Sequence, residues 1–236
     1  VDPTVSFSEY AQANPYYRKY NSAGEIEKYL YYPEDGINDS SVSNPLWNAH
    51  LNNYNKGQEF GFTNNFIIEW FATHDFRLRA KFGLTKSDDT SDVRLSPLHS
   101  QFDDVSDTEK GLYTHTQTKG LVYEGDLAAT FGRLFADKHM VNAVAGFNFS
   151  STKRENYGFS ANGFTDDQFD SPSFANSYPN GESPDYSRTE KRAASFYING
   201  GYAYDNRYLL DFNYRSDGAS MFGTDNRFRN TSDADI

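Results

Sequence analysis

The sequence predicts an all-β fold, and within that class a segment of an antiparallel transmembrane β-barrel. Three observations lead to this prediction. The chain is rich in aromatic residues and yet hydrophilic, apolar and polar residues alternate along several segments, and short turns alternate with long polar connections.

The composition of the 236 residues excludes several other classes of protein. Aromatic residues make up 17% and hydrophobic residues 37% of the chain, and the mean hydropathy is −0.79. A disordered chain would lack the aromatic residues, and a helical membrane protein would contain runs of about 20 apolar residues. A membrane β-barrel fits both facts, because only every second strand residue needs to be apolar and the loops are polar.

The net charge and the absence of Cys exclude one class of partner and several kinds of chemistry. The net charge of −11 argues against nucleic acid, because a phosphate-binding surface needs a basic stripe. The absence of Cys excludes a disulfide scaffold, a thiolate metal site and a Cys nucleophile. The chain opens on Val1-Asp2-Pro3 without a signal peptide, so we expect a mature form or a fragment.

Six segments are predicted to be strands, and they pair into three hairpins. The hairpins cover about 59–86, 120–151 and 191–216, with turns at 72–75, 136–139 and 205–206. Long loops are predicted at 1–58, 87–119 and 152–190. Turns of two to four residues suit β-hairpins. Their strict alternation with long connections is typical of outer-membrane barrels, which have short periplasmic turns and long outer loops.

Each predicted strand has one apolar and one polar face. In the third hairpin the apolar face comprises Phe196, Ile198, Tyr202, Tyr204, Tyr208, Leu210, Phe212 and Tyr214. The polar faces of the three hairpins include the charged residues Glu69, Arg77, Arg79, Lys81, Glu124, Asp126 and Asp211. These charges need water or one another, because an unpaired buried charge is costly. A soluble antiparallel sheet with one solvated face would show the same alternation, so this pattern alone leaves both structures open.

Aromatic residues beside the short turns favour a membrane barrel over a soluble sheet. Those at this end are Trp70, Phe71, Phe76, Phe135, Tyr204 and Tyr208. Such a cluster is expected of an interfacial girdle.

The sequence offers no case for catalysis. No nucleophile elbow, zinc-protease, P-loop or dinucleotide-binding motif is present, and the five His lack metal-ligand spacing. We therefore predict no enzyme activity, no catalytic residue, no metal ligand and no cofactor.

Five stretches resemble the SusC/RagA family of TonB-dependent outer-membrane transporters. They are 9–26, 44–70 ("NPLWNAHLNNYNKGQEFGFTNNFIIEW"), 76–89 ("FRLRAKFGLTKSDD"), 163–178 and 204–228. The last is the most specific, with a Tyr-Asp-x-Arg-Tyr turn, a strand, and then Arg-x-Asp-Gly-x-Ser-x-Phe-Gly-x-x-Asn-Arg-Phe. The final "RNTSDADI" departs from the family's usual continuation, and we expect a loop there.

The resemblance implies that the chain is the middle of a longer barrel of about 22 strands around a plugged lumen. The plug domain and the TonB box are absent from this chain. The whole protein would import oligosaccharides or peptides across the outer membrane of a Bacteroidota-type bacterium. TonB would drive import through the plug, and a SusD-like surface lipoprotein would cap the barrel.

The sequence does not identify the ligand-binding residues. Aromatic residues of the long loops can stack on sugar rings, or they can simply pack the loops together. These residues are Tyr16, Tyr17, Trp47, Tyr113, Phe164, Phe169 and Tyr178. Two other functions remain open: a passive porin-like channel and a soluble β-sheet carbohydrate-binding module.

Overall fold

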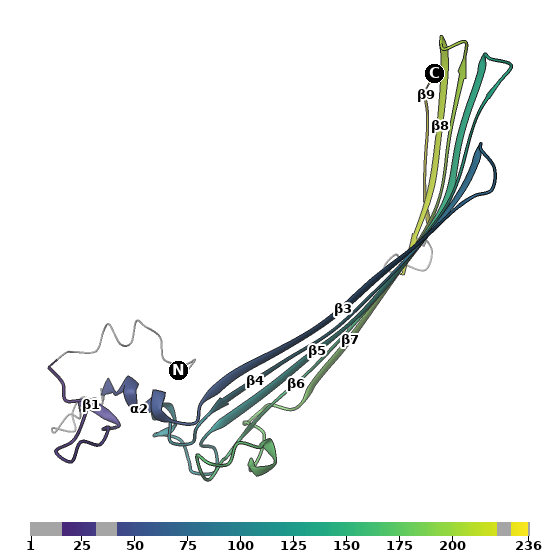
Figure 1. The fold of residues 1–236 in the computed structure, drawn as a ribbon. Coiled ribbons are helices and arrows are strands. Elements are labelled where there is room, and N and C mark those ends of the chain that lie inside the picture. Colours follow the sequence, from purple (N-terminus) through teal and green to yellow (C-terminus); the bar gives the residue numbers. More distant parts are fainter. Residues whose placement is uncertain (1–15, 32–41, 221–227, 236) are drawn as a thin grey trace. The chain divides into compact units, whose positions relative to one another are not determined.

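The computed structural model describes residues 16–31, 42–220 and 228–235. Its main element is a sheet of seven strands in which the spatial order follows the chain order (Figure 1). The strands are β3 (Tyr54–Phe71), β4 (Phe76–Leu95), β5 (Leu112–Phe135), β6 (His139–Asn162), β7 (Asp185–Tyr204), β8 (Tyr208–Ala219) and β9 (Phe228–Asp235). Successive strands are antiparallel, as the registers of β7 with β8 and of β8 with β9 show. The prediction of an antiparallel all-β fold is confirmed.

Small elements precede the sheet and connect its strands. They are β1 (Tyr29–Tyr31), β2 (Val42–Ser43), the helix α2 (Pro45–His50), and two 3₁₀ turns at Ser100–Phe102 and Pro172–Phe174. The α2 helix begins where its sequence predicts a start. Asn44 accepts a hydrogen bond from the Leu46 amide at 3.1 Å, and Pro45 occupies the first turn, where no amide hydrogen is needed. In the described part of the chain no helix is long and apolar enough to cross a membrane.

Tight turns join the strands of the hairpins. Ala136 and Asp137 have φ values of 48° and 57°, and Asp205 and Asn206 have 50° and 52°. Two consecutive left-handed residues define a type I′ turn, whose twist matches that of the strands it joins. The hairpin of β3 and β4 turns at residues 72–75 instead, closed by paired hydrogen bonds between Thr73 and Phe76.

The strands extend well beyond their predicted ends. The connection predicted at 87–119 is reduced to 96–111, and that predicted at 152–190 to 163–184. The added strand segments are rich in Ser, Thr, Asp and other polar residues, and apolar alternation within them is limited to short runs such as Tyr157, Phe159 and Ala161. Main-chain pairing does not require an apolar face, and the strands continue because their neighbours continue beside them.

The expectation of a loop in the last eight residues is wrong. Residues 228–235 form β9, which pairs with β8 from Gly218 opposite Phe228 to Asp211 opposite Asp235. Apart from Phe228 and Ala234 this segment is polar, and it carries no strand signal of its own, so its structure depends on the edge that β8 offers. Parts of two family-like stretches, 9–15 and 221–227, lie outside the described residues.

The chain divides into two compact units. The first comprises 1–59, 89–117 and 156–186, and the second comprises 60–88, 118–155 and 187–236. The buried apolar residues, all in the first unit, are Leu30, Leu95, Tyr113, Ala161 and Phe164. The second unit instead exposes large apolar side chains along its strands. Those of one strand parity are Phe60, Phe62, Phe66, Ile68, Trp70, Phe82, Leu127, Phe147, Phe149, Phe196, Tyr202, Leu210 and Phe212. Ile67 and Leu209, of the opposite parity, are also exposed, as are Phe71, Leu134, Phe135, Tyr204 and Tyr208 near the short turns.

Most of the exposed apolar residues of the second unit form a band on one face of its sheet. Alternate residues are apolar over 121–131 on β5, 141–149 on β6 and 196–204 on β7. These spans match the roughly 9–11 residues that a tilted strand needs to cross hydrocarbon. The band therefore has the length of a lipid-facing surface.

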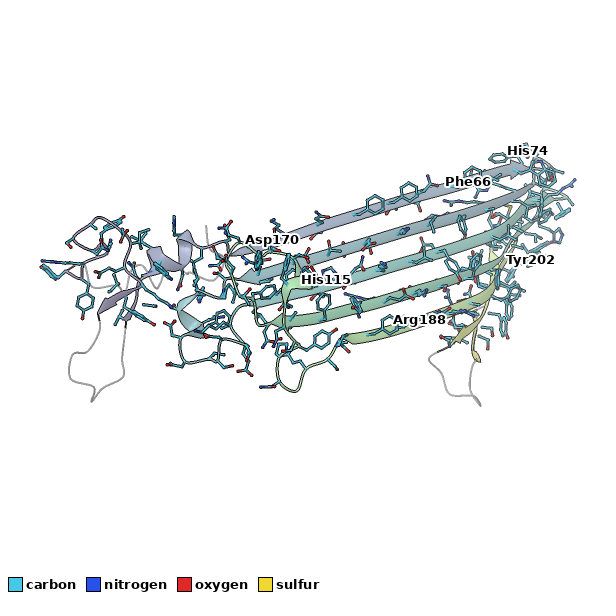
Figure 2. All side chains as sticks on the ribbon, turned by 90° about the horizontal axis from the view of Figure 1, so that it is seen from below. Phe66, His74, His115, Asp170, Arg188 and Tyr202 are labelled. Carbon is cyan, nitrogen blue, oxygen red and sulfur yellow. The ribbon has the colours of Figure 1, made fainter. Side chains whose placement is uncertain are left out.

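Aromatic residues gather where the band meets the short turns. Figure 2 shows Tyr202 at the same end of the sheet as His74, which lies in a short turn. The His139 Nδ1 atom lies 2.7 Å from the Tyr202 hydroxyl, and the ring centroids of His139 and Tyr204 are 5.0 Å apart. Rings with one polar end suit the boundary between lipid and water.

The two faces of β8 should respond differently to charge. Replacing Phe212 or Leu210 with Arg is expected to destabilise the intact barrel by roughly 2–4 kcal/mol at mid-bilayer depth, because the cation enters hydrocarbon. Asn213→Arg is the matched control, since this neighbour projects from the opposite face. Unfolding titrations in lipid vesicles measure the difference. Equal losses of stability on the two faces would mean that both faces of β8 are excluded from water.

Candidate functional site

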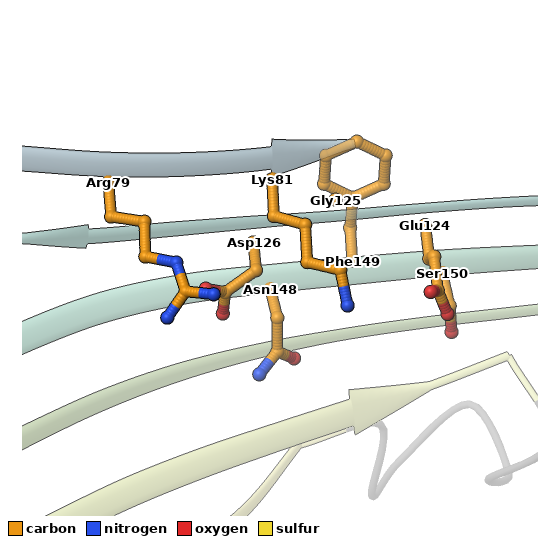
Figure 3. A pocket seen from close by; sticks show the side chains of 8 residues that line it. All are labelled: Arg79, Lys81, Glu124, Gly125, Asp126, Asn148, Phe149 and Ser150. Atoms are coloured by element: carbon orange, nitrogen blue, oxygen red, sulfur yellow. The ribbon is translucent and has the colours of Figure 1, made fainter. Parts of the chain in front are cut away.

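The polar face of the second unit carries a shallow hollow with charged walls. It has a volume of about 460 Å³ and is lined by Arg79, Lys81, Glu124, Gly125, Asp126, Asn148, Phe149 and Ser150. Figure 3 shows the charged side chains pointing to one side of the sheet, whereas the Phe149 ring points to the other. Strands β4, β5 and β6 each contribute, because alternate residues of each strand reach this face.

Most of these charges are solvated. The closest opposite charges are Arg79 and Glu69, with 3.5 Å between Nε and Oε1, and their side chains are 46% and 38% exposed. An exposed ion pair contributes about 0–1 kcal/mol to stability. The hollow is thus a wetted surface that offers two cations, two carboxylates, an amide and a hydroxyl to a polar solute.

A second hollow lies on the same unit, on β7, β8 and β9. It has a volume of about 430 Å³ and is lined by Tyr197, Asn199, Asn213, Tyr214, Arg215, Thr231 and Asp233. The Arg215 guanidinium donates to Asp217 at 2.8 Å and to the Ser195 hydroxyl at 3.3 Å. The Tyr197 ring occupies the space over Gly146, where an added Cβ would come within 2.1 Å of the ring. Gly146 therefore makes room for an aromatic side chain on the polar face.

The first unit is organised around the fully buried side chain of Arg94, on β4. Its guanidinium donates to the carbonyl oxygens of Asn52 at 2.5 Å, and of Asp167 and Phe169 at 3.0 Å each. The Asp167 carboxylate accepts from the Asn52 amide side chain at 2.9 Å and lies 3.8 Å from Arg94. These bonds fasten the connection 163–184 to the segment that precedes β3.

Asparagine side chains fasten a second connection, 96–111, to the same segment. Asn48 donates to the Ser100 hydroxyl at 2.8 Å and accepts from the Ser100 amide at 3.1 Å. Asn53 accepts from the Ser96 amide at 2.7 Å and donates to the Asn48 carbonyl at 2.8 Å. The repeated Asn side chains of "NPLWNAHLNNYN" thus supply hydrogen bonds to loop groups that have no partner in a regular strand or helix. Sequence reasoning noted this stretch only as a family likeness, although its high Asn content was the available signal.

Asp92, on β4, joins two aromatic neighbours on β5. The Tyr113 hydroxyl donates to Asp92 Oδ1 at 2.6 Å, and His115 Nδ1 lies 2.7 Å from the same oxygen. The His115 and Tyr113 rings contact Phe159, with centroids 5.6 and 5.9 Å away. The cluster belongs to the first unit and lies outside the apolar band.

Burial and hydrogen bonding oppose each other at Asp92. Burial alone would raise the pKa of Asp92, but the hydrogen bonds from His115 and Tyr113 stabilise its ionised form, so the pKa lies below its usual value of 3.8. Burial, with the Asp92 charge acting in the same direction, raises the pKa of Tyr113 well above its usual range. The cluster is therefore a carboxylate held by two donors.

The aromatic residues considered for sugar stacking fall into two groups. Tyr113 and Phe164 are buried, at 7% and 1% exposure, and pack the first unit. Trp47 is partly exposed and donates from Nε1 to the Leu98 carbonyl at 3.0 Å, and Tyr17 is also partly exposed. Tyr16, Phe169 and Tyr178 are exposed, and Phe169 stacks on Phe174 with centroids 4.7 Å apart. Only the exposed and partly exposed rings remain candidates for contact with a solute.

No group of three or more His, Asp or Glu that could hold a metal ion occurs among the residues that the structure describes.

Comparisons with known proteins give a consistent result. No protein-family profile matches the chain. The chain is 25% identical over 250 residues to the TonB-dependent receptor P26 of Formosa agariphila, an alignment that covers 95% of the chain and 23% of that receptor. Among solved structures, the RagAB peptide transporter matches with a TM-score of 0.71 and 18% identity, over 90% of this chain and 23% of that one. The RagAB peptide importer in its open-open state matches with the same TM-score and identity, over 93% and 23%.

The chain thus spans about a quarter of the length of the relatives that it matches. Its fold is that of a stretch of the wall of a large antiparallel β-barrel. The predicted resemblance to the SusC/RagA family of TonB-dependent transporters is confirmed by these similarities. The relatives are a receptor and transporters rather than enzymes.

Arg94 should be needed for the structure of the long connection 163–184. Arg94→Met removes donors from three carbonyl oxygens and leaves Asp167 without its cation, a change that typically costs about 3–5 kcal/mol. In the intact protein we expect residues 163–184 to become sensitive to limited proteolysis while the strands stay protected. Arg207→Met is the control, because Arg207 lies in a turn with its side chain 79% exposed. Unchanged cleavage in Arg94→Met would show that other contacts hold this connection.

The Asp92 cluster should make stability depend on acidity. Because the folded-state pKa lies below the usual 3.8, the carboxylate contributes stability above about pH 4, and that contribution is lost as the pH falls through the folded-state value. Denaturation of the intact protein between pH 3 and 7 should show wild type exceeding Asp92→Asn by an amount that shrinks below pH 4. Asp137→Asn, in an exposed turn, is the control for the loss of one carboxylate.

Proposed function

We propose that the chain forms part of the barrel wall of a TonB-dependent, SusC-like importer in a bacterial outer membrane. The importer takes up oligosaccharides or peptides and works with a SusD-like surface lipoprotein. The observation that carries this proposal is a sheet whose two faces are suited to different solvents, one with an uncovered apolar band and the other with wetted charges. The likeness to a TonB-dependent receptor supports the same function.

The apolar band argues against a soluble carbohydrate-binding module. Phe66, Trp70 and Phe212 are 58%, 59% and 46% exposed. Soluble monomers rarely leave contiguous apolar patches larger than a few hundred Å² uncovered. Lipid is the solvent that makes this face favourable.

The wetted hollow supports the proposed substrate classes. Arg79 and Lys81 can form charge-assisted hydrogen bonds with a peptide carboxylate. Glu124 and Asp126 can do the same with an amine. The same groups, with the Asn148 amide, can hydrogen-bond sugar hydroxyls. The SusD-like lid and the energy coupling rest on the family resemblance, since they involve parts beyond this chain.

Uptake in living cells tests the proposal. Cells that express the intact protein should accumulate labelled oligosaccharide or peptide, and a protonophore should abolish this accumulation because TonB needs the proton gradient. Persistent uptake with the protonophore would indicate a passive channel. Comparison of the two labelled substrates identifies the class that is carried, and cells without the gene give the background.

Labelling of single cysteines tests the orientation. The 236 residues contain no Cys, so an introduced one reports its own position. Ser183→Cys, in the connection before β7, should react with a membrane-impermeant maleimide added to intact cells. Arg207→Cys, in the turn between β7 and β8, should react only after the outer membrane is opened. The reverse pattern would invert the barrel.

A further inference from the structure

A row of cations lies at the end of the apolar band that is farther from the short turns. On β4 the band ends at Leu84 and the next residue on the same face is Lys86; on β5 it ends at Leu121, next to Lys119. On β6 and β7 one small residue intervenes, and then Lys153 and Arg192 follow. These four residues, here called the cation row, are the first charged side chains past the band on four neighbouring strands.

The alternation of faces is unbroken at this level of the sheet. Residues of the opposite parity meet on the polar face, where the added Cβ of Gly120 would lie 2.5 Å from the Ser87 hydroxyl. Residues of the row's parity meet on the apolar face, where Arg188 Nε lies 3.9 Å from Glu155 Oε1 across β6 and β7. The cation row therefore shares a face with the apolar band.

Neighbouring carboxylates neutralise the row only in part. Lys153 pairs with Glu155 at 2.8 Å, and Arg192 pairs with Glu190. Asp88 lies on the same face one step beyond Lys86. Counting Arg188, five cations face three carboxylates, although the whole chain has a net charge of −11. Lys86 and Lys119 are exposed. No ion pair within 4.0 Å is formed by either within the described chain, although the charge of Lys119 helps to stabilise the ionised form of Glu155.

The position of the row indicates what it contacts. The band below it has the length of a hydrocarbon core, so the row lies at the depth of lipid headgroups. Figure 2 shows Arg188 on β7, far along the strand from Tyr202 and the short-turn end. A basic side chain near a membrane surface attracts an anionic lipid by about 1 kcal/mol. Arg can bind phosphate through two parallel hydrogen bonds, and Lys binds it as a point charge.

We propose that the cation row binds the phosphate groups of lipid in the leaflet nearest the long connections, with the acyl chains of that lipid against the apolar band. This inference rests on the proposed membrane location. The occupant is a phosphorylated lipid rather than free phosphate, because the apolar side chains that continue the same face add a contact that only a lipid can make.

Lipid retention by the intact protein tests the proposal. Wild type reconstituted in nanodiscs with a bisphosphorylated glycolipid should retain that lipid through detergent exchange, as measured by native mass spectrometry. Lys119→Gln alone should weaken retention about fivefold, which corresponds to about 1 kcal/mol. The combined variant Lys86→Gln, Lys119→Gln, Lys153→Gln and Arg192→Gln should lose it by more than tenfold.

The opposite face supplies the matched control. The double variant Arg79→Gln, Lys81→Gln removes two positive charges from the polar face. It should leave lipid retention unchanged. Equal loss in this control would show a general charge effect and overturn the proposal. So would undiminished binding of the dephosphorylated glycolipid, or full displacement by millimolar inorganic phosphate.

Failure of the inference can be told apart from failure of the proposed function. A protein that fractionates with the membrane and takes up solute, yet retains lipid equally in all variants, would disprove the cation row as a lipid site alone. A protein found in the aqueous fraction without detergent would disprove the importer and the lipid site together.

Discussion

Hydrocarbon offers no hydrogen-bond partner, so a lipid-facing strand must satisfy its main-chain groups through neighbouring strands. The sequential order of β3 to β9 meets this demand within the described sheet, because each strand pairs with its neighbours in the chain. Once the backbone is satisfied, the side chains of each strand are free to suit a different solvent on each face. The apolar band and the wetted hollows are both consequences of this single arrangement.

The same strands change their chemistry along their length. In the second unit the apolar face needs no protein cover, and the band has little buried core. In the first unit a dense set of polar contacts around Arg94 and the Asn side chains contributes the stability instead. Such contacts are directional, so they fix the shape of the connections more narrowly than apolar packing would.

The sequence predicted the elements whose cause is local. Hairpin turns and the two faces of each strand follow from short-range chemistry: left-handed turn residues at Asp205-Asn206, and a period of two in the strands. The strand segments next to the long connections, and β9, could not be predicted, because their mostly polar residues leave only short runs of apolar alternation. The structural role of Arg94 could not be predicted from the sequence either, because its partners Asp167 and Phe169 lie 73 and 75 residues away. Tyr113 and Phe164 look like loop aromatics in the sequence, and only the fold shows that they are buried.

The neighbour-to-neighbour order of the strands also bears on how such a sheet is built. Every hairpin closes through a turn of a few residues, so its first contacts have low sequence separation and a small loop-closure cost. Each completed strand then serves as the template for the next. Growth of this kind proceeds from one hairpin to the next, so that mispairing is confined to the open edges of the sheet. A polar strand such as β9 can join late and without apolar patterning of its own, because the edge of β8 already dictates where its backbone must go.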